Sequence, residues 1–296
     1  MKAAVFFRAS AVVLLLCLSA LAQGRADRKP RFKAVAFDYF VIFDANSVIP
    51  EVEKVFPGKG AEFTKAWRSK QFEYGYLRSI TNAHEDFFKV TGDALDYTAE
   101  AMGLTLTAEN RERLLNAYLT LKPWPDAVDA LKELRAAGVR IITIANFSER
   151  MLRANADNAG ITGLFDELLS TEVNHTYKPD PQAYELGLKH LHLRKEEVLF
   201  AAFGGWDAYG AKSFGYPTYW VNRFGQPTER LGETADRTSG DLAGLLGFVL
   251  GRAANEEGVL RGEASSDWQP ATPGFVPVPS IFPLLDSNDK SNGFPG

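Results

Sequence analysis

Short apolar runs, separated from one another by helical patterns, recur along this chain. The first of them, Ala34–Phe37, stops at a carboxylate, Asp38. Runs of this length and composition are typical of strands that are buried on both faces of a sheet. Because helices separate the runs, the strands should be parallel and joined by right-handed crossovers, which predicts an α/β fold with a Rossmann-like parallel sheet core. The expected strands are 34–37, 139–145, 167–170, 198–202 and 218–221, and the expected helices are 127–137, 149–158, 181–190, 208–214 and 239–250.

One helical block interrupts this alternation after the first strand. Residues 52–121 carry helical signals and no convincing strand pattern, so we predict a helical cap inserted into the core domain. The expected boundaries are 31–49 and 123–250 for the core and 50–122 for the cap, with cap helices at 93–102 and 109–121 and an apolar helix face formed by Phe63, Trp67, Phe72 and Tyr76.

The first 22 residues have the organisation of a cleavable secretory signal peptide. A basic start precedes an apolar stretch, residues 11–21, and Ala20-Leu21-Ala22 is a small-x-small cleavage site, so we expect cutting before Gln23. The apolar stretch is shorter than the roughly 20 residues of a membrane span. Leu16 precedes the only cysteine, Cys17, which argues against a lipoprotein anchor. The sequence therefore predicts a periplasmic or secreted protein with no membrane anchor.

The composition of the remaining chain narrows its class. About 270 residues remain after cleavage and none is a cysteine, so no disulfide framework is expected in an oxidising compartment. A net charge of −4 and the lack of a basic cluster argue against a nucleic-acid partner. Residues 251–296 are interpreted as a flexible C-terminal tail, because 265–296 is rich in Pro, Ser, Gly, Asn and Asp. Apolar residues around Phe275 and Ile281 leave docking on a surface open.

Polar side chains follow three of the expected strands. Asp38, Asn146 and Asp207 come after strands 34–37, 139–145 and 198–202, and Lys178 lies in a loop before the last of these. The carboxyl ends of such strands line the ligand crevice, so these groups can converge. Asp38 alone fits a nucleophile, a metal ligand or a turn cap. The plainer interpretations of the others are a solvated loop lysine for Lys178 and a helix N-cap for Asp207.

Several short motifs accompany this arrangement. They are Ala36-Phe37-Asp38, Phe43–Val48, Trp67–Gln71, Glu73-Tyr74, Leu77–Ser79, Tyr177–Asp180, Tyr184-Glu185, Trp206–Ala208 and Gly210-Ala211. On these motifs, from about Arg31 to Leu250, the chain resembles the haloacid dehalogenase superfamily, and within it the type II group of (S)-2-haloacid dehalogenases. The Trp-Arg-x-Lys-Gln and Trp-Asp-Ala motifs are specific to that group.

The resemblance implies a metal-independent hydrolytic dehalogenase that acts on small (S)-2-haloacids and needs no cofactor. Asp38 would be the nucleophile that attacks the halogen-bearing carbon, forming an ester that water then hydrolyses. Lys178 would pair with Asp38, and Asp207 would position or deprotonate the hydrolytic water.

The resemblance also implies residues that bind the substrate. Arg68, from the cap, would meet the leaving halide, since its guanidinium is permanently charged. Asn146 would shape the substrate pocket, and Tyr184 would support the site. Relatives of this group are commonly dimers, which implies a homodimer.

Two positions favour the metal-free branch of the superfamily. Its phosphotransferases carry a second aspartate two residues after the nucleophile, whereas this chain has Phe40, which neither donates a proton nor binds Mg²⁺. The acidic pair that those enzymes use for Mg²⁺ is reduced to Asp207. A phosphatase is therefore disfavoured.

Several polar groups of the type II pattern are replaced. The nucleophile loop is one residue shorter and lacks its glycine, Val41 stands in place of threonine, and Ala145 in place of serine. The stretch 202–206, with Ala202 and Gly204, lacks the usual serines and asparagine. Each lost hydrogen bond to a charged group is worth roughly 1.5–3 kcal/mol, so the ordinary reaction could be badly weakened.

Two explanations fit these replacements. The first is an enzyme that keeps the aspartyl ester but prefers bulkier 2-halo acids or another electrophile. The second is an exported, non-catalytic relative that binds a small ligand, with its charged residues forming only a structural ion network. The enzyme is favoured because a binding protein has no need to keep four charges in a desolvated site. Its more apolar pocket would be formed by Phe40, Val41, Ala145 and Phe203.

Overall fold

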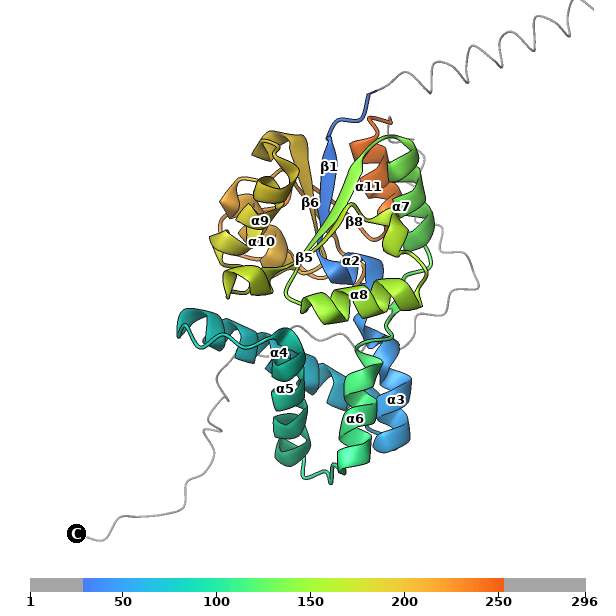
Figure 1. The fold of residues 1–296 in the computed structure, drawn as a ribbon, viewed down its shortest axis with the longest axis vertical. Coiled ribbons are helices and arrows are strands. Elements are labelled where there is room, and N and C mark those ends of the chain that lie inside the picture. Colours follow the sequence, from blue (N-terminus) through green and yellow to red (C-terminus); the bar gives the residue numbers. More distant parts are fainter. Residues whose placement is uncertain (1–28, 253–296) are drawn as a thin grey trace, which may run out of the picture.

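The computed structural model describes residues 29–252. The expected signal peptide, residues 1–22, and all but the first two residues of the expected tail lie outside the described residues. Figure 1 shows a sheet covered by helices and, below it, a second group of helices. Within the described range, no helix is both long enough and apolar enough to cross a membrane.

A six-stranded parallel sheet forms the core. Its strand order is β5-β4-β1-β6-β7-β8, so β1 is central and pairs with both β4 and β6. The predicted α/β fold is confirmed, and the five expected strands are present with bounds that differ by at most one residue. The strands are β1 (Ala34–Phe37), β4 (Arg140–Ala145), β5 (Glu167–Ser170), β6 (Val198–Ala202), β7 (Thr218–Val221) and β8 (Arg237–Ser239).

The sixth strand, β8, was not predicted. It pairs with β7, and its last residue, Ser239, lies opposite Val221. The prediction of a helix from Ser239 is therefore wrong at its start, since α11 (Leu242–Val249) begins after the N-cap residue Asp241. The Arg-Thr-Ser sequence of β8 is polar and largely exposed, so this edge strand has no apolar run from which it could be predicted.

Helices cover both faces of the sheet, with α7 (Ala127–Ala136), α8 (Glu149–Asn158) and α11 on one face and α9 (Pro181–Leu191) and α10 (Gly205–Phe214) on the other (Figure 1). Successive side chains of a strand point to opposite faces. Accordingly, Val35 and Phe37 of β1 pack with the first group of helices, and Ala34 and Ala36 pack with the second.

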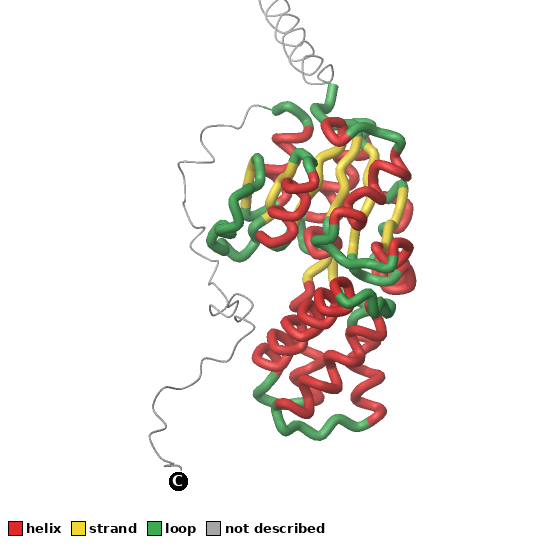
Figure 2. The backbone as a smooth tube through the Cα atoms, turned by 90° about the vertical axis from the view of Figure 1, so that its left-hand side faces the viewer, coloured by secondary structure: helices red, strands yellow, loops and turns green. Residues whose placement is uncertain are grey.

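Four helices follow the first strand as the predicted helical insert. They are α3 (Ile49–Val55), α4 (Gly60–Ile80), α5 (Phe87–Ala101) and α6 (Ala108–Ala117). A short antiparallel ribbon, β2 (Phe43–Asp44) with β3 (Lys122–Pro123), leads the chain into this cap and back (Figure 2). The remaining short elements are α2 (Tyr39–Ile42) and the 3₁₀ turns η1 (Ala45–Val48), η2 (Thr162–Leu164), η3 (Thr171–Asn174) and η4 (Lys195–Glu197).

Two cap helices have other bounds than the sequence predicted. α5 begins at Phe87, six residues before the predicted start, because the Asp86 carboxylate accepts hydrogen bonds from two N–H groups of its first turn. α6 ends at Ala117, four residues before the predicted end. The N–H of Leu121 is instead bound by Asn155 Oδ1 of α8 at 2.6 Å, which ties the returning chain to the core.

The buried face of α4 also differs from the predicted one. It contains Phe63, Trp67, Gln71 and Gly75, in steps of four residues, whereas the predicted member Tyr76 is 42% exposed. Trp67 is fully buried and donates its indole N–H to the carbonyl of Thr91 in α5 at 2.8 Å. Burial of this face holds α4 in the cap.

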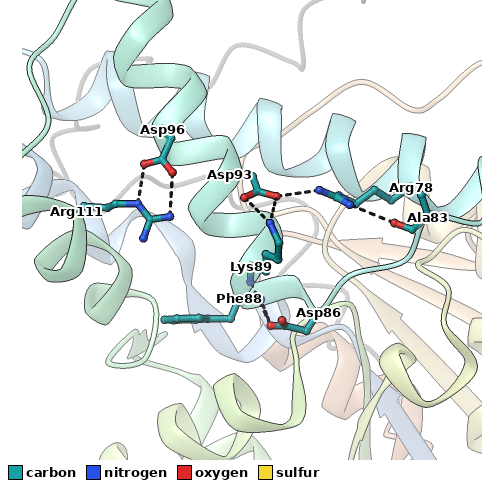
Figure 3. Close-up of polar contacts among 8 residues, drawn as sticks. All are labelled: Arg78, Ala83, Asp86, Phe88, Lys89, Asp93, Asp96 and Arg111. Atoms are coloured by element: carbon teal, nitrogen blue, oxygen red, sulfur yellow. Dashed lines mark hydrogen bonds and ion pairs between the residues drawn. The ribbon is translucent and has the colours of Figure 1, made fainter. Parts of the chain in front are cut away.

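Charged side chains join neighbouring cap helices, as Figure 3 shows. Asp93 of α5 pairs with Arg78 of α4 at 2.9 Å and with Lys89 of its own helix. Asp96 accepts two hydrogen bonds from Arg111 of α6, at 2.7 and 2.9 Å. These side chains are partly exposed, so each pair contributes at most about 1 kcal/mol. The pairs therefore contribute more to the relative orientation of the cap helices than to the stability of the cap.

Candidate active site

The polar residues predicted at the strand ends lie at the edge of the sheet that faces the cap. Asp38 follows β1, Asn146 follows β4, and Asp207 lies in the first turn of α10, after β6. Since β4, β1 and β6 are neighbours, their carboxyl ends bring these three side chains to one place. Figure 1 shows α2, which follows β1, on the side of the core that faces the cap.

Asp38 has two partners, one for each carboxylate oxygen. Its Oδ1 accepts the N–H of Phe40 at 2.9 Å and thereby caps α2. Its Oδ2 accepts a hydrogen bond from Lys178 Nζ at 2.6 Å. The turn-cap interpretation and the ion-pair interpretation of Asp38 are therefore both correct. The cap bond fixes the side-chain orientation, and 12% of the side chain is left exposed.

Lys178 is a buried cation shared by two carboxylates. Its Nζ lies 2.8 Å from Asp207 Oδ2 as well as 2.6 Å from Asp38 Oδ2, and its side chain is 1% exposed. The interpretation of Lys178 as a solvated loop lysine is wrong. Its backbone N–H donates to Asn146 Oδ1 at 2.8 Å, which fixes the loop that carries it.

Asp207 is held from both sides. The hydroxyl of Tyr184 donates to its Oδ1 at 2.7 Å, opposite the bond from Lys178 to Oδ2. The N-cap interpretation of Asp207 is wrong, because α10 begins three residues earlier than predicted and its N-cap residue is Gly204. A side chain at Gly210 would collide with the Tyr184 hydroxyl, because a Cβ there would overlap it. Glycine at this position leaves room for the tyrosine.

Burial and ion pairing shift the pKa values of this cluster. Burial raises the pKa of Asp207 to about 6, against the lowering effect of Lys178 and with a further rise from Asp38. Burial by itself would lower the pKa of Lys178, but Asp207 and Asp38 more than offset it, so the pKa lies above its ordinary value. Lys178 therefore stays an ammonium at neutral pH, while Asp207 becomes ionised within the physiological range.

Asn146 holds the backbone of the loop that carries Lys178. Its Oδ1 accepts from the Lys178 N–H and from the hydroxyl of Thr171, at 2.8 and 3.4 Å. These bonds show Asn146 supporting the lysine loop. A direct part in shaping the substrate pocket is left as a prediction.

Arg68 reaches the site from α4 of the cap. Its guanidinium carbon lies 5.0 Å from the centre of the Phe40 ring, which is a cation–π contact. Phe40 is the residue whose backbone N–H donates to the Asp38 carboxylate. Burial lowers the pKa of Arg68, whereas Asp44 and Asp38 act in the opposite direction. An arginine stays protonated at ordinary pH, so the cap places a positive charge near Asp38 and Asp44.

Aromatic rings surround these charges. Phe40 contacts Phe147 with ring centres 5.2 Å apart and Phe203 at 6.0 Å. On the cap side, Phe72 packs on Trp206 at 4.7 Å. The four residues expected to make the pocket apolar divide into two kinds. Phe40 and Phe203 are partly exposed, whereas Val41 and Ala145 are buried, as is the replaced residue Ala202.

Gly204 is required by the approach of Trp206. A Cβ at Gly204 would lie 2.6 Å from the indole nitrogen of Trp206, so the ring occupies the space that a side chain at position 204 would need. Trp206 was noted in the sequence only as part of a motif, because its contact with Phe72 joins residues that are far apart in the chain.

Arg223 is a supporting residue that the sequence analysis missed. It follows β7, binds both carboxylate oxygens of Asp126 at 2.8 and 3.1 Å, and donates to the carbonyl of Val41 in α2 at 3.1 Å. Its guanidinium also lies over the ring of Trp124 at 4.6 Å. Arg223 thereby fixes the short helix that follows Asp38. An isolated arginine carries no motif, so no sequence signal could have revealed this contact.

Comparison with known proteins decides the family. Residues 32–215 match the family model described as haloacid dehalogenase-like hydrolase. The chain belongs to this family. It is 41% identical over 205 residues to the (S)-2-haloacid dehalogenase of Pseudomonas sp. (strain YL), covering 69% of this chain and 88% of the relative. It is 39% identical over 209 residues to haloacetate dehalogenase H-2 of Moraxella sp. (strain B), covering 70% and 93%.

Solved structures of haloacid dehalogenases share the fold. The L-2-haloacid dehalogenase of Xanthobacter autotrophicus matches with a TM-score of 0.71 at 34% identity, over 75% of this chain and 100% of that one. The structure of that enzyme with chloropropionic acid covalently bound matches with a TM-score of 0.71 at 33% identity, over the same shares of the two chains. The match thus extends over both the sheet and the cap.

The shared cation predicts a large stability effect. Lys178→Met should lower the free energy of unfolding by about 3–5 kcal/mol near neutral pH, because two buried carboxylates lose their partner. Without the lowering effect of Lys178, the pKa of Asp207 in the folded variant lies above the wild-type value of about 6. The variant then binds a proton that the wild type does not, so the loss should shrink as the pH falls from above neutral towards about 6. Urea unfolding at several pH values measures it.

Lys212→Met is the matched control. Lys212 Nζ pairs with Asp236 at 2.6 Å, but its side chain is 28% exposed, so its loss should cost at most about 1 kcal/mol. Equal, pH-independent losses in the two variants would contradict the account of Lys178.

Proposed function

We propose that this protein is a hydrolytic dehalogenase that acts on (S)-2-haloacids through a covalent aspartyl ester on Asp38. The supporting observation is the arrangement of Lys178 between Asp38 and Asp207, with Arg68 of the cap facing the same place. The similar relatives named above are called (S)-2-haloacid and haloacetate dehalogenases, and one homologous structure has its substrate acid covalently bound.

In the first step, an Asp38 oxygen attacks the carbon that bears the halogen. The carbon–halogen bond breaks, the halide leaves with the bonding electrons, and an ester joins Asp38 to the acid. Lys178 and the Phe40 N–H donate hydrogen bonds to the Asp38 carboxylate and fix its orientation. Arg68 provides positive charge for the departing halide.

In the second step, water attacks the ester carbonyl carbon of Asp38. Asp207 accepts the water proton, which requires its ionised form and therefore a pH above about 6. The bond between the carbonyl carbon and the former Asp38 oxygen breaks, and that oxygen takes the proton back from Asp207 and leaves as the hydroxyl group of a 2-hydroxy acid. The new carboxyl group of Asp38 gives its proton to solvent, which restores the aspartate. Tyr184 and Lys178 hold Asp207 in place meanwhile.

The first step exchanges one anion for another. Esterification makes Asp38 neutral and releases a halide, so the sum of the charges in the site, with the carboxylate of the substrate included, does not change. The two cations, Lys178 and Arg68, therefore keep anionic partners while Asp38 is esterified, and a buried charge without a partner would be costly. This favours an enzyme over a non-catalytic relative that binds a small ligand.

The replaced polar groups are proposed to change specificity. Phe40 and Phe203 are partly exposed beside the nucleophile, so they offer apolar contact to the substituent on the reacting carbon. The buried Ala145 and Ala202 remove hydroxyls without opening a polar site. The pocket should therefore favour larger apolar 2-substituents over haloacetates.

Export by the predicted signal peptide and a homodimer remain parts of this proposal. They rest on the sequence pattern and on the resemblance to the type II group.

Halide release by the mature chain, beginning at Gln23, tests the proposed function. We expect halide from (S)- but not (R)-2-halo acids, and we expect Asp38→Asn to abolish it at least a thousandfold, since the nucleophile is lost. Asp129→Asn, the same change at a side chain of α7 that is 91% exposed, should remain active.

A folded chain that released no halide from any member of the panel would reject the enzyme. Ligand binding retained by Asp38→Asn would then support the non-catalytic alternative.

Substrate preference tests the apolar pocket. Each buried methylene is worth about 0.8 kcal/mol, or roughly fourfold, so kcat/KM should rise from chloroacetate to (S)-2-chlorobutanoate and (S)-2-chlorohexanoate. Phe203→Ala should flatten this rise. A chain that turned over chloroacetate faster than the longer acids would contradict the proposed preference.

A further inference from the structure

Two of the four histidines of the chain meet at the boundary between cap and core. His84 lies in the connection from α4 to α5, and His175 follows η3 of the core. Their rings are 5.4 Å apart at 74°, and His84 also stacks on Tyr177 at 5.1 Å. Within the described residues, Nε2 of His84 is buried without a hydrogen-bond partner. An imidazole so placed is best accommodated when it is neutral.

Tyr177 connects this cluster to the cap. Its hydroxyl donates to the backbone carbonyl of Glu85, and its ring packs on Phe87 with ring centres 5.8 Å apart. A Cβ added to Gly75 of α4 would lie 3.5 Å from the same ring. The neighbouring Thr176 shares a hydrogen bond of 2.9 Å with Ser79 of α4.

The residues that contact the cap immediately precede Lys178 in the chain. His175, Thr176 and Tyr177 each contact the cap, and the next residue is Lys178. The backbone that carries the ammonium is therefore fixed on one side by the cap and on the other by Asn146.

The charges around His84 come from both domains. Burial first, and then His175, lower the pKa of His84, while Glu172 of the core and Asp86 and Glu85 of the cap act in the opposite direction. Burial raises the pKa of Tyr177, with Arg78 opposing, so its hydroxyl stays a donor.

We propose that His84, His175 and Tyr177 form a latch between cap and core that positions Lys178 against Asp38, and that protonation of His84 releases it. The latch concerns the geometry of the cap, whereas its effect on turnover rests on the proposed function of Lys178. Tyr177 and His84 are positioning residues in this account.

The direction of the pH effect follows from the lowered pKa of His84. With the cap open, the imidazole returns to water and to its ordinary pKa of 6.5. The open form therefore binds protons more readily, and the closed form is favoured at a pH well above 6.5. Closure weakens as the pH falls through 6.5 towards the lower value of the closed form.

Hydrogen–deuterium exchange at about pH 7.5 and pH 5.5 tests the latch without any substrate. Exchange of residues 83–87 and 174–178, corrected for the intrinsic chemical rates, should become about three- to tenfold faster in the wild type at the lower pH. His84→Phe keeps a ring against Tyr177 but cannot be protonated, so it should lose this dependence. His190→Phe, the same change at an exposed position of α9, should behave as the wild type.

Activity tests the positioning of Lys178. Tyr177→Phe removes only the hydroxyl that binds Glu85, and should lower kcat/KM by about three- to tenfold with faster exchange at Lys178. Asp207 also loses its carboxylate form near pH 6, so all variants should keep an acid limb in the pH profile. In His84→Phe that limb should be shallower.

Each result decides the proposal. A pH dependence of exchange that is unchanged in His84→Phe would overturn the switch, and a Tyr177→Phe variant with wild-type exchange and kcat/KM would overturn the latch. If the chain released no halide at all, the proposed function would fail, and the exchange experiment would still decide the latch.

Discussion

One buried ammonium organises the candidate active site. Lys178 holds the carboxylates of Asp38 and Asp207 together at 2.6 and 2.8 Å, and its loss would leave both of them without a cationic partner in a buried place. Asn146 fixes the backbone of the lysine, Tyr184 fixes Asp207, and a helix-cap bond fixes Asp38. The sheet supplies these groups from neighbouring strand ends, so the topology of the fold sets their spacing.

The cap completes a site that the core alone leaves open. It contributes Arg68 and the aromatic ring of Phe72, and it contacts the loop that carries Lys178. Charges therefore lie in the centre of the site, and rings of Phe40, Phe147, Phe203 and Trp206 surround them. The loss of polar side chains from this surround, with the charged residues kept, is consistent with a changed substrate preference and a retained reaction.

The local sequence pattern was sufficient to predict much of the fold and the charged residues at the centre of the candidate site. The apolar strands, the position of Asp38 after β1 and the charged residues of the motifs could all be predicted, because burial and strand ends leave clear sequence signals. The polar edge strand β8 and the start of α5, set by one capping bond of Asp86, leave weak signals. Arg223 and His84 act through partners 50 residues or more away in the chain, so only the folded structure reveals them.

The central claim is that the reaction passes through an ester on Asp38, and isotope transfer tests it most directly. A single turnover of (S)-2-chlorobutanoate in H₂¹⁸O, with enzyme in excess, should place ¹⁸O in the peptide that contains Asp38 and leave the released 2-hydroxy acid unlabelled, because water attacks the aspartyl carbonyl carbon. A hydroxy acid that carries ¹⁸O after one turnover, with Asp38 unlabelled, would show direct attack of water on the substrate and contradict the account.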